Sequence, residues 1–156
     1  MRTMIGLMLL LLIGCTGKAE ETYTMEDAKA DGYVVVEHKG NTFDQIVQGA
    51  IEIENLQQIN NVLEAFKNGK TQSATIYIFD SDGNYYKNSL KTEGRSIQFE
   101  NNYGGYKGAP KGSFSCEYIE KRGPIVYLES CSREKGEDIS TMIGFVGSEK
   151  EFKEAK

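Results

Sequence analysis

Apolar residues along the chain follow two spacings, one typical of helices and one typical of strands. The helical spacing is clearest at 55–68, where an apolar stripe recurs every three or four positions. The residues of this stripe are Leu56, Ile59, Val62, Leu63 and Phe66. We expect Asn55 to cap the start of this helix and Gly69 to supply the left-handed residue after its end.

Many other stretches have the alternation or the β-branched composition of strands. Segments rich in Gly, Asn, Asp and Pro separate most of them, as expected for turns between antiparallel strands. The predicted strands are 33–38, 75–79, 85–91, 95–100, 114–121, 125–131 and 139–145. Residues 42–53 have mixed spacing, and there we expect an irregular link followed by a short strand at 50–53.

The remaining segments are polar or rich in glycine. Thr24 and Asp27 have the spacing of a capping box, which predicts a helix of one turn ending at Gly32. Residues 102–112 form a long glycine-rich connection, and a charged tail follows the last predicted strand. Together these elements predict an α+β domain, with one main amphipathic helix packed on an antiparallel β-meander sheet.

The first residues have the pattern of an export signal. Arg2 gives the leader a positive charge, and the apolar run at 5–13 is too short to span a bilayer, which needs roughly 20 residues. The run ends in Leu12-Ile13-Gly14-Cys15, which resembles the lipobox of bacterial lipoproteins. That resemblance implies cleavage before Cys15 and acylation of its thiol with palmitate-type chains. Two or more acyl chains give stable attachment to the extracytoplasmic face of the cell membrane.

The expected organisation follows from this signal. Residues 1–14 are a signal peptide, 15–31 are the lipidated cysteine and a polar tether, and 32–156 are a single extracytoplasmic domain. The alternatives are an ordinary secretory signal with a chance cysteine and a free cysteine in the core.

The cysteines fit an exported protein. If Cys15 carries lipid, Cys116 and Cys131 remain as a pair in a compartment that permits disulfides. Pairing them across neighbouring strands places Gly123 and Pro124 at the hairpin centre, where this residue order fits a type II′ turn. Such a turn makes the cysteines a hydrogen-bonded pair, with side chains less close, so a longer loop is one alternative. Two buried free thiols are another.

Composition and charge exclude two broad classes. The formal net charge is −5, and the lysines are scattered singly, which argues against binding to nucleic acid. The chain is 39% hydrophobic and contains nine Tyr and seven Phe, too apolar for a disordered protein.

No catalytic or metal-binding motif emerges from the sequence. His38 is the only histidine, and no nucleophile signature accompanies it. One histidine and two paired cysteines do not supply a zinc site. Residues 80–84 (DSDGN) resemble part of a calcium loop, but Gly83 is in the wrong position for an EF-hand. We therefore interpret 80–84 as a hairpin turn, and we expect no cofactor.

Glutamates and tyrosines are the other candidates for chemistry. Glu117, Glu120 and Glu129 crowd the disulfide hairpin, where two carboxylates could serve glycoside hydrolysis. Because Glu117 and Glu120 alternate to opposite faces of a strand, we interpret them as solvated charges. Several tyrosines could line a sugar-binding or protein-binding face, or be half-buried residues of the sheet. These are Tyr77, Tyr85, Tyr86, Tyr118 and Tyr127.

The glycine-rich connection at 102–112 is the best candidate binding site. Tyr103, Tyr106, Lys107 and Lys111 lie on this long loop and could form a binding lip. A loop that merely connects two strands is the alternative.

The chain contains five short sequence features that can be compared with known families. They are Glu26-Asp27-Ala28, Gly32 with Val34-Val35, a helix opening at Asn55-Leu56 and closing at 67–70, an Ile-rich strand at 76–78, and the two late cysteines. In these features the chain resembles an uncharacterised family of small lipoproteins of Gram-positive bacilli that carry a domain of unknown function. The resemblance implies a position on the outer face of the plasma membrane and no known activity.

Three classes of function remain. The first is a non-enzymatic module that binds a protein or a cell-wall component, of which an immunity or inhibitor-like role is one form. The second is a structural or stress-related envelope protein without a ligand, and the third is an envelope hydrolase using His38 and Glu120. We expect the first.

Overall fold

The computed structural model describes residues 23–155, so the predicted signal peptide and lipidated Cys15 lie outside the described residues. In chain order the elements are α1 (Met25–Ala30), β1 (Val34–His38), α2 (Phe43–Val47), β2 (Ile51–Glu54), α3 (Gln57–Lys67), β3 (Gln72–Phe79), β4 (Tyr85–Glu93), β5 (Ser96–Asn101), β6 (Gly112–Arg122), β7 (Ile125–Ser132), β8 (Ile139–Val146) and α4 (Glu149–Glu154).

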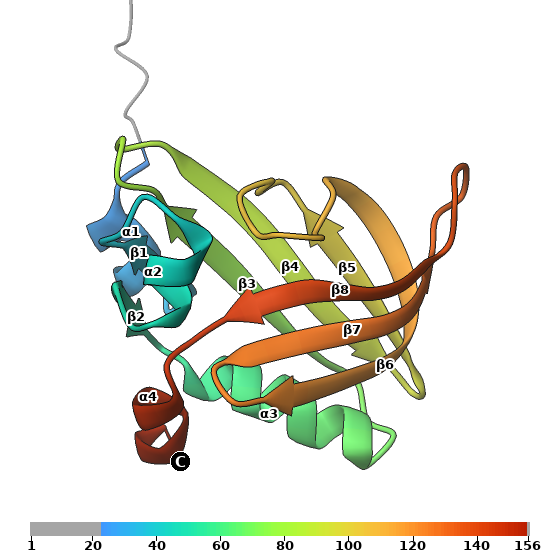
Figure 1. Ribbon diagram of the computed structural model, residues 1–156. Coiled ribbons are helices and arrows are strands. Elements are labelled where there is room, and N and C mark those ends of the chain that lie inside the picture. Colours follow the sequence, from blue (N-terminus) through green and yellow to red (C-terminus); the bar gives the residue numbers. More distant parts are fainter. Residues whose placement is uncertain (1–22, 156) are drawn as a thin grey trace, which may run out of the picture.

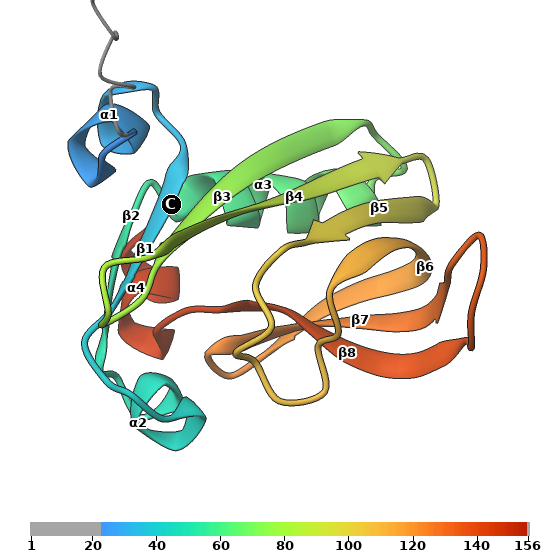
Figure 2. The same cartoon turned by 90° about the horizontal axis from the view of Figure 1, so that it is seen from above.

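The strands form one eight-stranded sheet in the order β2-β1-β3-β4-β5-β6-β7-β8. The sheet curls so strongly that β3–β5 face β6–β8 across a shared interior (Figure 2). Helix α3 lies at one end of the curled sheet, and the connection between β5 and β6 lies at the other (Figure 1). The predicted fold is therefore matched in its main features: an antiparallel-rich sheet, helices and a disulfide hairpin.

Two details of the fold prediction need correction. Strands β3 to β8 follow one another antiparallel, as a meander does, but β1 and β3 are parallel. They are parallel because β2 first returns the chain antiparallel to β1, and α3 then carries it past β1 to the start of β3. Besides the main helix α3 of 11 residues, the described residues also contain three short helices of five or six residues, α1, α2 and α4.

Helix α3 buries the predicted apolar stripe, and its end has the predicted form. Gly69 has a φ of 63°, and the Lys70 amide donates to the Ala65 carbonyl at 2.8 Å, which is the bond of a Schellman motif. The predicted cap at Asn55 is wrong, since the side chain makes no cap bond with the helix. The Asn55 amide instead donates to the Tyr33 carbonyl at 2.9 Å, a tertiary contact.

Two segments predicted to be irregular contain short helices. In α2, Thr42 and Gln45 form a capping box, which stabilises the first turn despite the mixed apolar spacing. In α4, Ser148 caps the start, and Phe152 is buried against Phe145 at a ring-centroid distance of 6.1 Å. The expected irregular link before 50–53 and the expected charged tail are therefore partly helical. Local caps stabilise both helices, and one buried aromatic side chain holds α4 on the domain.

The β6–β7 hairpin has the predicted turn and disulfide. A two-residue turn, Gly123-Pro124, joins the strands, and Gly123 has a φ of 61°, as the first position of a type II′ turn requires. Cys116 and Cys131 are disulfide-bonded, with a Cα–Cα distance of 4.0 Å. The alternatives of a longer loop and of free thiols are therefore wrong.

Strand β6 departs from regular alternation next to this disulfide. Cys116 and Ile119 are both buried, whereas Glu117 and Tyr118 between them are both exposed. Ser130, on the opposite strand, has a φ of 51° and interrupts the pairing there. The strand therefore changes face at this point, and the expected alternation of Glu117 and Glu120 to opposite faces does not hold.

The apolar residues form two clusters on the two sides of the sheet. The larger cluster fills the interior of the curled sheet and includes the stripe of α3. The smaller one lies under α1, where Ala28 packs with Val35, Tyr77 and Phe79. Helix α1 has the predicted capping box and packs on the folded sheet. Within 23–155, no helix combines the length and apolar composition needed to cross a bilayer.

Candidate functional site

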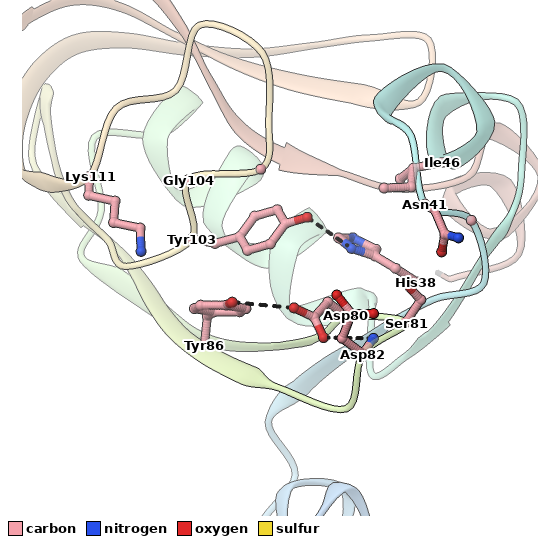
Figure 3. Close-up of a pocket in the computed structure, with 12 residues that line it drawn as sticks. His38, Asn41, Ile46, Asp80, Ser81, Asp82, Tyr86, Tyr103, Gly104 and Lys111 are labelled. Carbon is pink, nitrogen blue, oxygen red and sulfur yellow. Dashed lines mark hydrogen bonds between the residues drawn. The ribbon is translucent and has the colours of Figure 1, made fainter.

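A pocket of about 420 Å³ opens at the end of the sheet opposite α3. The parallel strands β1 and β3 both end here, so the segments that follow them meet at one edge. The loop between β5 and β6 closes the other side (Figure 3). The residues that line the pocket are His38, Gly40, Asn41, Ile46, Asp80, Ser81, Asp82, Tyr86, Tyr103, Gly104, Gly105 and Lys111.

His38 is the buried centre of this site, and only 3% of it is exposed. Its Nδ1 atom lies 3.2 Å from the Tyr103 hydroxyl, and its Nε2 atom lies 3.2 Å from the Tyr106 hydroxyl. A neutral imidazole donates from one nitrogen and accepts at the other, so one tyrosine accepts a hydrogen bond and the other donates one. Both tyrosines come from the loop between β5 and β6, which His38 therefore fixes to the end of β1.

These three side chains are uncharged at neutral pH. Burial lowers the pKa of His38 to about 4, although the nearby charge of Asp80 opposes this effect. Burial also raises the pKa of Tyr103 and of Tyr106 above the ordinary value for tyrosine. The inner wall of the pocket is therefore a neutral network of hydrogen bonds.

Asp80 organises the turn between β3 and β4. Its carboxylate accepts hydrogen bonds from the Asp82 amide at 3.0 Å, the Asn84 amide at 2.9 Å and the Tyr86 hydroxyl at 3.3 Å. Burial raises the pKa of Asp80, but the bonds from Asn84, Asp82 and Tyr86 outweigh it and hold that pKa below its usual value. The predicted hairpin turn at 80–84 is confirmed, and its carboxylate is ionised and fully engaged.

The predicted binding loop contributes to the pocket through two of its four candidate residues. Tyr103 and Lys111 line the pocket, and the Lys111 ammonium lies 5.4 Å from the centre of the Tyr86 ring. Tyr106 is buried behind Tyr103, at a ring-centroid distance of 4.8 Å. Lys107 is exposed and does not line the pocket.

Two buried asparagines hold this loop in place. The Asn88 amide donates to the Asn101 side chain at 2.9 Å, and the Asn101 amide donates to the Ala109 carbonyl at 3.1 Å. The Asn102 backbone amide in turn donates to Asn88 at 2.8 Å. Sequence reasoning missed Asn88 and Asn101. Their place among the inward-facing residues of two alternating strands is a signal that could have found them, because a buried amide needs hydrogen-bond partners.

The other candidate residues lie elsewhere. Glu120 and Glu129 both pair with the Arg122 guanidinium, so they form a surface ion-pair cluster. Glu117 lies beside a separate groove next to the disulfide.

The five candidate tyrosines do not form one face. Tyr77 and Tyr85 pack together near α1, Tyr118 is 56% exposed, Tyr127 lies against Arg122, and Tyr86 lines the pocket.

Metal ligands are not clustered in the described part of the chain, where no three His, Cys, Asp or Glu side chains come together as a candidate site.

Comparison with known proteins finds no matching family, no similar curated protein and no similar solved structure. The resemblance to small lipoproteins of Gram-positive bacilli therefore stays a prediction, and a functional interpretation depends on the geometry of the pocket.

Proposed function

We propose that the chain is a lipoprotein, held by lipid on Cys15 at the extracytoplasmic face of the cell membrane, and that its domain is a non-enzymatic binding module. Its ligand is a small polar molecule that enters the pocket beside His38. The lipobox-like sequence supports the location, and the pocket supports the binding role.

The observation that carries the binding role is the fixed arrangement of polar groups around the pocket. His38 anchors Tyr103, Asp80 anchors Tyr86, and Asn101 anchors the loop, each through hydrogen bonds within the domain. A site whose side chains are already ordered loses little conformational entropy when a ligand binds. The volume of about 420 Å³ falls in the range of small-molecule sites.

The environment of His38 favours binding over catalysis. A general base works best when its pKa lies near the working pH, whereas burial lowers the pKa of His38 to about 4. Within residues 23–155, the hydrogen-bond partners of its ring are two tyrosine hydroxyls, and neither is the serine or cysteine that a nucleophilic mechanism needs.

A thermal-shift screen of the full-length chain in detergent tests this proposal. The panel contains divalent metals, wall fragments, sugars, amino acids and small peptides. A ligand at about 100 times its dissociation constant should add about 2.7 kcal/mol to the free energy of unfolding.

Two lysines of the same loop provide a matched pair of variants. Lys111→Gln changes the pocket lining, and Lys107→Gln changes a lysine outside it. We expect a ligand whose shift is reduced by Lys111→Gln and unchanged by Lys107→Gln. The proposal is wrong if no compound shifts the midpoint, or if the two variants respond alike.

A further inference from the structure

The charges that line the pocket are not all satisfied by the protein. Among the described residues, no carboxylate lies within ion-pair distance of the Lys111 ammonium, which instead lies over the Tyr86 ring. Within the same residues, the Asp82 carboxylate has no ion-pair partner. Asp82 takes part in the turn at 80–84 through its backbone amide, which donates to the Asp80 carboxylate. Asp80, in contrast, is fully engaged.

The two unpaired charges lie on different sides of the pocket. Lys111 projects from the loop on one side of Tyr86 and Tyr103, and Asp82 belongs to the turn on the other side (Figure 3). Of the other lining residues, His38 and Tyr103 are uncharged at neutral pH, and the charged Asp80 carboxylate accepts hydrogen bonds from Asn84 and Tyr86. Among the described residues that line the pocket, Lys111 and Asp82 therefore carry the charges that have no ion-pair or hydrogen-bond partner, and an aromatic and polar floor separates them.

We propose that the ligand is a small zwitterion, which carries an ammonium and a carboxylate on one short skeleton: a free amino acid or a short peptide. This inference rests on the proposed function and names the ligand class of the same pocket. The ligand carboxylate pairs with Lys111, and the ligand ammonium lies at the Asp80–Asp82 turn. Charge-assisted hydrogen bonds of this kind are about twice as strong as neutral ones.

The alternatives leave charges unmet. A neutral sugar would hydrogen-bond to Lys111 and Asp82 through its hydroxyl groups, but it would neutralise neither charge. A simple anion would pair with Lys111, but it would lie close to two carboxylates, Asp80 and Asp82, and like charges at close range repel. A zwitterion pairs with both Lys111 and Asp82 and adds no net charge to the pocket.

Blocked ligands test the assignment directly. Isothermal titration of the full-length chain in detergent compares free amino acids and dialanine with their amides, which lack the carboxylate, and their N-acetyl forms, which lack the ammonium. We expect each block to weaken binding by about tenfold or more, since each removes one charged contact. Comparison of alanine with dialanine separates a free amino acid from a short peptide as the source of the zwitterion.

Charge-removing variants assign each end of the ligand. Lys111→Gln should abolish the preference for the free acid over the amide, and Asp82→Asn should abolish the preference for the free amine over the N-acetyl form. Lys107→Gln is the control and should preserve both preferences.

The zwitterionic ligand and the binding role of the domain can be refuted separately. Equal binding of free and blocked forms, or binding of a neutral sugar that Lys111→Gln weakens, would overturn the zwitterion and keep the binding module. No binding that depends on Lys111 anywhere in the screen would overturn both.

Discussion

Burial of His38 makes the stability of the domain depend on pH in a defined window. The unfolded histidine has a pKa of 6.5, and the folded one has a pKa of about 4. Between these values, the unfolded chain binds a proton that the folded chain excludes. The contribution of His38 to stability is therefore fully present above pH 6.5, and it is lost as the pH falls toward 4.

The magnitude follows from the difference between the two pKa values, which is about 2.5. At about 1.4 kcal/mol for each unit, the full loss is at most about 3.5 kcal/mol, of which about 2 kcal/mol falls between pH 7 and pH 4.5. That is a large share of the stability of an ordinary domain, which is about 5–15 kcal/mol.

Urea denaturation at pH 7 and pH 4.5 measures this effect when the wild type is compared with His38→Gln. Glutamine keeps a polar side chain between the two tyrosines but does not titrate. All carboxylates titrate in both proteins, so the difference between their pH-dependent losses isolates His38. We expect the wild type to lose about 2 kcal/mol more than the variant between the two pH values.

Tyr106→Phe provides the control, because it removes a hydrogen-bond partner of His38 and leaves the imidazole buried and titratable. This variant should keep the pH dependence of the wild type. Equal losses in the wild type and His38→Gln would refute the reasoning, since His38 would then titrate alike in the folded and unfolded chains.

Three further predictions concern the disulfide, the loop and the anchor. Replacing both Cys116 and Cys131 with Ala opens a loop with a sequence separation of 15, and urea denaturation should show a loss of about 3 kcal/mol. Gly105→Ala places a Cβ atom 2.2 Å from the Tyr103 hydroxyl, and the forced movement should cost about 1–3 kcal/mol in the same assay. Cys15→Ser should move the protein from the membrane to the soluble fraction on cell fractionation, because the lipid is its anchor.

Each of these predictions has an outcome that contradicts it. Unchanged stability without the disulfide would mean that the unfolded chain gains no freedom when the loop opens. Gly104→Ala is the control for Gly105→Ala, because the atoms nearest to its Cβ belong to the flexible side chain of Lys111, so equal effects would be inconsistent with the Tyr103 clash. Retention of Cys15→Ser in membranes, with its signal uncleaved, would contradict the lipoprotein assignment.

The features that the sequence predicts correctly are mostly local. The stripe of α3 and the turn at Gly123-Pro124 depend on residues within a few positions of one another, where spacing and turn chemistry decide the structure. The disulfide agrees with that turn, since pairing Cys116 with Cys131 across β6 and β7 places Gly123-Pro124 at the hairpin centre. The errors arise where a tertiary contact competes, as at Asn55, whose side chain bonds to Tyr33 instead of capping α3.

The site could be predicted only in part for the same reason. Tyr103 and Lys111 were candidates because they lie on a long glycine-rich loop. The role of His38 was not foreseen, because its partners Tyr103 and Tyr106 lie 65 and 68 positions further along the chain. Only the parallel pairing of β1 with β3 brings the end of β1 beside the 80–84 turn, and that pairing has no local signature.

Ligand binding in the pocket beside His38 can be tested directly on the folded chain. The most direct test is to titrate a ligand from the screen into the ¹⁵N-labelled chain and to map the changes in backbone amide shifts. We predict the largest changes at Asn41, Ser81, Gly104 and Gly105, which line the pocket. Changes centred instead on the exposed outer face around Tyr118, with none at these four residues, would show that the ligand binds outside this pocket.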